Sequence, residues 1–116
     1  MMNNYFIILA SGQSKRFNSS KPKQFIKYKN KALFEHSLDK ALKSKLFKKI
    51  IIVTNDKKQI KKEYSKDVLI IKGGKERSDS SLIALKFIKK YKPKNVLIHD
   101  AARPNFTIKL LKNLIN

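Results

Sequence analysis

Short apolar runs alternate with helical patterns along most of this chain, and that alternation limits the folds open to it. Four runs rich in Ile, Leu and Val lie at residues 5–10, 49–54, 68–71 and 95–98. Continuous apolar runs of this length are typical of strands buried on both faces of a parallel sheet. The sequence therefore predicts four strands that share one buried sheet.

Between these runs, apolar residues recur at helical spacing. One face of each expected helix carries, in chain order, Phe34, Leu38, Ala41 and Leu42; Ala84, Phe87, Ile88 and Tyr91; and Ile108, Leu111 and Ile115. A shorter helix is expected at Ile60 and Tyr64, capped by Asn55 or Asp56, and the last helix begins at Thr107. This alternation predicts an α/β fold with a Rossmann-like, doubly wound, mainly parallel sheet and right-handed crossovers.

The composition is strongly basic, with a formal net charge of +20, yet only three of the 28 basic residues are arginine. Arginine is preferred for bidentate recognition of phosphates and base edges. Lysines spread along the whole chain indicate solvated surfaces rather than a nucleic-acid interface, and their field would attract small anionic substrates. A basic nucleic-acid-binding domain is kept as the alternative from another functional class.

Other classes are excluded by simple counts. The chain has no cysteine, which excludes disulfides and thiolate metal sites. The apolar run at 5–10 is too short for a signal-peptide core or a membrane span, and no basic segment precedes it. We therefore expect a cytoplasmic protein with no membrane partner.

Glycine and arginine, which are rare in this chain, gather after the predicted strands. Every glycine lies in such a loop: Gly12, Gly73 and Gly74. The arginines lie in the same loops or where these loops meet helices: Arg16, Arg77 and Arg103. Ligands of open α/β sheets bind beyond the carboxyl ends of the strands. The sequence thus predicts a ligand site at this edge of the sheet.

The loop after the first run combines small residues with cations. Ser11 and Gly12 let the backbone come close to a ligand, and backbone N–H groups in such a loop can hold a phosphate. Lys15, Arg16 and Lys23 add positive charge. The loop has neither the P-loop spacing nor the three-glycine dinucleotide fingerprint. A solvated basic loop with one turn glycine is the alternative interpretation.

The second loop contains the glycine pair Gly73–Gly74 and leads through several serines into a helix. The pair permits positive φ and close approach of a ligand, and the serines can cap the helix. A helix N-terminus also offers free N–H groups to an anion or a carbonyl. An ordinary capped helix after a Gly-Gly turn would have the same sequence.

The third loop begins with His99 and Asp100, directly after the fourth run. An aspartate at the carboxyl end of a parallel strand is suited to hold Mg²⁺ beside a polyphosphate. In the alternative interpretation Asp100 caps a turn and pairs with Arg103. His36 and His99 are the only histidines, and we assign catalysis to neither.

Four segments taken together resemble one family in their order and spacing. They are Ile8-Leu9-Ala10-Ser11-Gly12 with Lys15-Arg16-Phe17, Pro22-Lys23-Gln24-Phe25, Gly73-Gly74 with Arg77 and Ser80, and His99-Asp100-Ala101-Ala102-Arg103-Pro104. On these segments the chain resembles the 2-C-methyl-D-erythritol 4-phosphate cytidylyltransferase family, whose fold is of the nucleotide-diphospho-sugar transferase type. The first segment is shared by many nucleotidyltransferases, and the last points to this family.

The resemblance implies a role for each matching residue. The nucleotide site would be lined by Ala10, Ser11, Gly12 and Ser14, the last standing where family members commonly have a second glycine. Arg16 and Lys23 would hold the triphosphate of CTP and stabilise charge at the α-phosphorus. Gly74 and Ser80 would read the cytosine, next to Lys75, where an acidic residue is common. Asp100 would hold Mg²⁺, and Arg103 would order that loop at the nucleotide.

The resemblance also implies partners and a domain organisation. The substrates would be CTP and a sugar or polyol phosphate, with 2-C-methyl-D-erythritol 4-phosphate favoured and ribitol 5-phosphate as the rival acceptor. Residues 1–116 would form the N-terminal nucleotide-binding part of a single cytidylyltransferase domain, truncated before the acceptor-binding residues. The full-length form is expected to be a homodimer.

Overall fold

A computed structural model of the chain describes residues 3–10, 27–28, 31–55, 60, 68–74, 77–100 and 107–115. Its main sheet has four parallel strands in the order β5-β4-β1-β6: Val68–Ile71, Lys49–Val53, Asn4–Leu9 and Asn95–Asp100. The two central strands, β1 and β4, are almost fully buried, whereas β5 and β6 are partly exposed. The predicted parallel sheet is confirmed.

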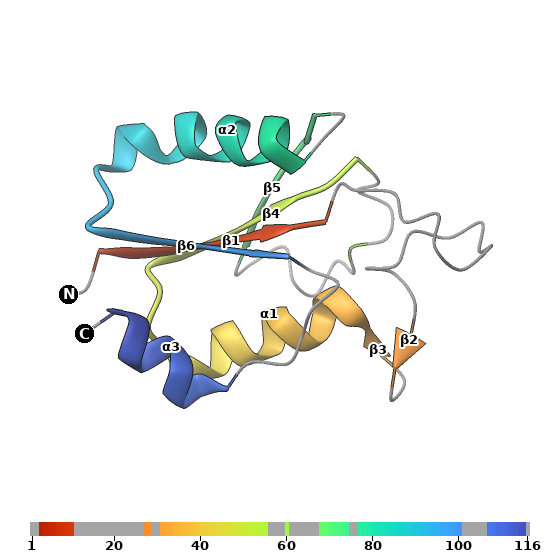
Figure 1. Cartoon of the computed structure of the whole chain (residues 1–116), viewed down its shortest axis with the longest axis vertical. Coiled ribbons are helices and arrows are strands. Elements are labelled where there is room, and N and C mark those ends of the chain that lie inside the picture. The colour runs from red at the N-terminus through yellow and green to blue at the C-terminus, as the bar shows by residue number, and fades with distance from the viewer. Residues whose placement is uncertain are drawn as a thin grey trace.

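Helices cover both faces of the sheet (Figure 1). Helix α2 (Arg77–Ile88), continued by the 3₁₀ turn η4 (Lys89–Tyr91), lies on one face. Helices α1 (Leu33–Ser44) and α3 (Ile108–Ile115) lie on the other. None of the helices in the described part of the chain is long and apolar enough to cross a bilayer.

Alternate residues of β1 enter two separate cores, because successive side chains of a strand point to opposite faces. Phe6 and Ile8 pack with Phe34 and Leu38 of α1 and with Leu111 of α3. On the other face, the β1 residues Tyr5, Ile7 and Leu9 pack with Ala84 and Ile88 of α2. A strand with large apolar residues on both faces is stable only between two layers of helix. This explains the continuous apolar run seen in the sequence.

The strand order fixes where a ligand site can form. From β1 the chain continues outward to β4 and then to β5. Helix α2 then connects β5 back to β6, which lies on the other side of β1. α1 and α2 lie on opposite faces because their connections run in opposite directions with the same handedness. The strand order therefore reverses between β1 and β6, and this switch point is where open α/β sheets bind their ligands.

The structure corrects several predicted boundaries. His99 and Asp100 are the last residues of β6 rather than the start of a loop. Ser80 and its serine neighbours lie inside the first turns of α2. Two very short antiparallel strands, β2 (Lys27–Tyr28) and β3 (Lys31–Ala32), were not predicted. Most of the short helix expected at Ile60 and Tyr64 lies outside the described residues, although Ile60 is buried in the α1-side core.

The predicted last helix is confirmed, although it begins at Ile108 and Thr107, predicted as its first residue, caps it. Thr107 precedes α3 and its Oγ1 accepts a hydrogen bond of 3.1 Å from the backbone N–H of Leu110. The predicted apolar face is also present, since Leu111 is buried and both Ile108 and Ile115 are half-buried.

Candidate functional site

The carboxyl ends of the four strands lie in one row. Leu9 of β1 is opposite Val53 of β4 on one side and Asp100 of β6 on the other, and Val53 is opposite Ile71 of β5. The residues that follow these positions therefore emerge along a single edge of the sheet. Three of the predicted site residues within the described part, Ala10, Gly74 and Asp100, belong to this edge.

Ala10 continues the pairing of β1 by one residue. Its backbone N–H donates a hydrogen bond of 2.7 Å to the carbonyl of Val53, and its side chain is buried in the core on the α1 side. The amide of Ala10 is thus committed to the sheet. The predicted phosphate-binding N–H groups of this loop would have to belong to residues after Ala10, which lie outside the described part.

Gly74 is held at both of its polar backbone groups. Its N–H donates a hydrogen bond of 3.1 Å to the Oγ of Ser80, in the first turn of α2. Its carbonyl accepts a hydrogen bond of 3.2 Å from the side-chain Nδ2 of Asn55, which follows β4. Ser80 is fully buried, so this contact anchors the glycine loop to the base of the helix. Hydrogen bonds from two different elements therefore hold the N–H and the carbonyl of Gly74.

Glycine is required at position 74 for space. A Cβ built there would overlap the Cβ of Asp79, in the first turn of α2. Neither Gly73 nor Gly74 has a positive φ, so the pair does not use the left-handed conformation that glycine permits. The positive φ values belong instead to Lys45 and Lys92, at 56° and 49°, just after α1 and after η4.

Asp100 ends β6 beside the switch point, with its side chain partly buried. Among the described residues there is no group of three or more His, Cys, Asp or Glu side chains that could hold a metal ion by itself. A single carboxylate at a strand end fits Mg²⁺ when a bound polyphosphate and water supply the other oxygens. It does not fit a protein-enclosed metal such as structural zinc.

Five of the predicted site residues lie outside the described part of the chain: Ser11, Gly12, Ser14, Arg16 and Lys23. Arg103 lies outside it as well. Their roles stay predictions. Each of these segments is attached to a strand end of the same edge, since residue 11 follows Ala10 and residue 101 follows Asp100.

The contact of Asn55 with the Gly74 loop was not predicted, because the sequence context of Asn55 indicated a helix cap. The useful signal was its position directly after a buried strand, the same signal that identified Asp100. Its neighbour Thr54 extends the β4–β5 pairing, with its N–H donating a hydrogen bond of 2.9 Å to the carbonyl of Ile71.

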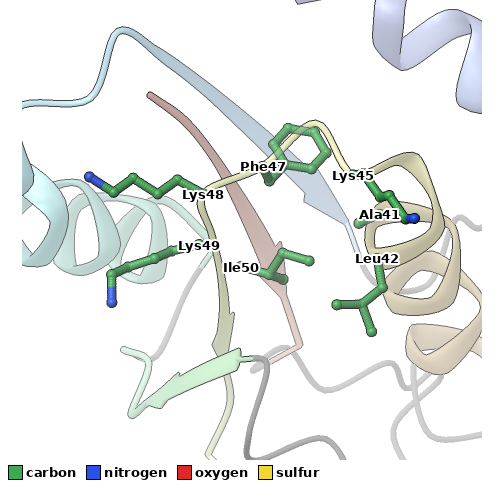
Figure 2. Close-up of a pocket in the computed structure, with 7 residues that line it drawn as sticks. All are labelled: Ala41, Leu42, Lys45, Phe47, Lys48, Lys49 and Ile50. Carbon is green, nitrogen blue, oxygen red and sulfur yellow. The ribbon is translucent and has the colours of Figure 1, made fainter. Parts of the chain in front are cut away.

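A pocket of about 280 Å³ lies at the other end of the sheet, between the end of α1 and the start of β4 (Figure 2). Ala41, Leu42, Phe47 and Ile50 line it together with Lys45, Lys48 and Lys49. Figure 2 shows the ammonium groups of Lys48 and Lys49 on one side and that of Lys45 on the other. These cations do not converge, so the pocket is not built to hold an anion.

Comparison with known proteins decides the family. The sequence profile described as IspD, 2-C-methyl-D-erythritol 4-phosphate cytidylyltransferase, matches residues 5–116. The chain belongs to this family. The cytidylyltransferase resemblance seen in the four sequence segments is therefore confirmed, as is the fold.

Individual relatives agree with this assignment. The bifunctional enzyme IspD/IspF of Pelagibacter ubique is 55% identical over 99% of this chain, which spans 32% of that protein. The 2-C-methyl-D-erythritol 4-phosphate cytidylyltransferase of Thermosipho melanesiensis is 40% identical, over 87% of this chain and 48% of its own length. The solved bifunctional IspDF of Campylobacter jejuni has a TM-score of 0.81 and 30% identity, covering 97% of this chain and 29% of its own. The chain thus spans half or less of these cytidylyltransferase relatives.

Proposed function

We propose that this chain contributes the nucleotide-binding part of a CTP-dependent cytidylyltransferase. The reaction would form 4-diphosphocytidyl-2-C-methyl-D-erythritol and pyrophosphate from CTP and 2-C-methyl-D-erythritol 4-phosphate, in non-mevalonate isoprenoid biosynthesis. Residues 1–116 would be the N-terminal part of a single domain. The cytoplasm is the proposed location, and a homodimer the proposed full-length form.

One observation supports a nucleotide at this edge more than any other. Ala10 and Asp100 flank the switch point of the sheet, and Asn55 draws the Gly74 loop from β5 towards the end of β4. A nucleotide spanning the edge could therefore meet the glycine loop with its base and the β1 and β6 ends with its phosphates.

In the proposed reaction, a phosphate oxygen of the acceptor attacks the α-phosphorus of CTP in line with the leaving group. The new P–O bond forms as the bond between the α-phosphorus and the bridging oxygen breaks, and pyrophosphate leaves with that electron pair. Catalysis of this kind depends on positioning and charge stabilisation rather than a covalent protein group. Arg16 and Lys23 are the residues we assign to charge at the α-phosphorus, and Arg103 to the order of its loop.

Asp100 is the residue we assign to Mg²⁺, which when bound would neutralise negative charge on the polyphosphate. On the base side, Gly74 and Ser80 are assigned to cytosine. Cytosine carries a 4-amino donor where uracil carries a carbonyl acceptor, so a backbone carbonyl directed at that position would favour CTP over UTP. Ser11, Gly12 and Ser14 complete the proposed nucleotide lining beyond Ala10.

The test is the nucleotide preference of the folded chain, measured by titration calorimetry with CTP, UTP and ATP, each with Mg²⁺. The proposal expects tighter binding of CTP than of the other two. Equal affinity for all three would remove the cytosine-reading role of Gly74 and Ser80. Binding that needed long nucleic acid and fell steeply with salt, with no affinity for CTP, would favour the basic-domain alternative.

A further inference from the structure

The ends of β4 and β5 are joined by more than their strand pairing. The regular pairing ends at Val53 opposite Ile71, and the N–H of Thr54 adds one further backbone hydrogen bond. Beyond it, the side chain of Asn55 reaches across to the carbonyl of Gly74 at 3.2 Å. The Asn55 side chain thus continues the link between the two strands beyond the last backbone hydrogen bond, and it holds Gly74, three positions past the end of β5.

Gly74 is therefore fixed from two different elements. Ser80 in α2 holds its N–H, Asn55 after β4 holds its carbonyl, and the Cβ of Asp79 leaves no room for a side chain at its Cα. The Ser80 contact alone would leave the carbonyl free to rotate with the following peptide. The Asn55 contact sets the direction of that carbonyl, and a carbonyl oxygen with one lone pair engaged still offers the second.

We propose that Asn55 is a positioning residue for base recognition, which acts by orienting the Gly74 carbonyl. The proposal rests on the proposed function, in which Gly74 reads the cytosine. A directed acceptor favours the 4-amino donor of cytosine and opposes the carbonyl of uracil. An acceptor that can turn away would bind CTP less tightly and reject UTP less strongly. Loss of the Asn55 donor should therefore reduce the CTP preference itself.

Asn55→Leu removes the amide donor while keeping side-chain size and neutral charge. Because Asn55 is exposed, the substitution leaves no buried group behind, and we expect the urea midpoint to change little. Asn113→Leu is the matched control, since Asn113 is an exposed asparagine on α3, away from the edge. Calorimetry with CTP and with UTP, each with Mg²⁺, gives the affinity ratio for the parent chain and both variants.

We expect Asn55→Leu to lower the ratio of CTP to UTP affinity by about three- to tenfold, the effect of one lost hydrogen bond. Asn113→Leu should leave the ratio unchanged. An unchanged ratio in Asn55→Leu would overturn the proposal, and so would an equal loss for both nucleotides, which indicates a merely structural brace.

A second variant, Asn55→Asp, tests whether the lost donor explains the change in the affinity ratio. Asn55→Asp also lacks the donor but adds a negative charge, which should weaken both triphosphates; we expect the ratio to fall as in Asn55→Leu. A ratio kept by Asn55→Asp would count against the proposal. A parent chain with no CTP preference would instead reject the proposed function, so the two failures are distinguishable.

Discussion

The packing of Gly74 against α2 gives the sharpest test of the site geometry. In Gly74→Ala the new methyl group would overlap the Cβ of Asp79, so either the loop or the first helical turn must move. Overpacking of this kind costs about 1–3 kcal/mol. The same shift would strain the hydrogen bonds of Gly74 to Ser80 and Asn55, each worth about 0.5–1.5 kcal/mol. We expect a total loss of about 2–4 kcal/mol in the free energy of unfolding.

A double-mutant cycle isolates this contact. The overlap is with a Cβ, so Asp79→Ala keeps it and Asp79→Gly removes it. Glycine in a helix costs roughly 0.5–1 kcal/mol relative to alanine, so Asp79→Gly alone should destabilise. Gly74→Ala should therefore cost about 1–3 kcal/mol less in the Asp79→Gly background than in the Asp79→Ala background, each measured against its own Asp79 single variant.

Urea unfolding followed by circular dichroism measures the cycle. With a slope of about 1–3 kcal/mol per molar urea, a loss of this size moves the midpoint by roughly 0.7–4 M. The reasoning is refuted if Gly74→Ala is as stable as the parent, or if Asp79→Gly and Asp79→Ala respond to it identically. Either result would mean that the loop does not pack on α2 through this pair of atoms.

Three further predictions concern single residues. Lys23→Ala, in a protein of the relatives' full length, should lower kcat by a factor of about 10²–10³, because a donor is lost at the α-phosphorus. Lys86→Ala, on the exposed side of α2, is the control and should leave kcat unchanged. Equal small losses for both variants in a pyrophosphate-release assay would contradict the role of Lys23. Tyr5→Phe should stabilise the fold by about 1 kcal/mol, since the buried Tyr5 hydroxyl makes no hydrogen bond to the described residues. Burial, and then the nearby Tyr91, raise the pKa of Tyr5 above 10.0, so the parent should lose stability as pH rises past 10.0 and the variant should lose less, which urea midpoints at alkaline pH would check. Thr107→Ala should cost about 1 kcal/mol through loss of the α3 cap, and thermal unfolding unchanged from the parent would contradict it.

The sheet could be predicted from sequence because its strands are apolar and the two central ones, β1 and β4, are buried on both faces. The run at 68–71 coincides with β5, and the run at 49–54 overruns β4 by one residue. β6 was predicted too short because strand pairing uses backbone groups, which polar residues such as His99 and Asp100 also possess. The β2–β3 pair was missed because two-residue strands carry no apolar pattern.

Two helix ends could not be located from glycine, because lysine occupies the left-handed position at each of them. Helices commonly end in a left-handed residue, usually glycine. Here α1 and the η4 turn are each followed by a left-handed lysine, Lys45 and Lys92, whose N–H groups bond back to Leu42 and Lys89. The chain has only three glycines, and lysine occupies the left-handed position after these two helical segments. Gly74 instead occupies a position where a side chain cannot fit.

The contacts at the sheet edge divide the proposed recognition between two kinds of residue. In the described part of the edge, backbone groups form hydrogen bonds within the protein: the N–H of Ala10 donates to Val53, and Gly74 is bonded to Ser80 and Asn55. It can orient a base, but it offers little charge of its own. In the proposed site the triphosphate would therefore be held by the cations of segments 11–26 and 101–106, assisted by the field of a chain with net charge +20. Salt screens that field, with a Debye length of about 8–10 Å at 0.10–0.15 M, but not a hydrogen bond to a base. Raising the salt concentration should weaken CTP and UTP equally and leave their affinity ratio intact. A ratio that collapsed with salt would place the discrimination in the charges instead of the Gly74 loop.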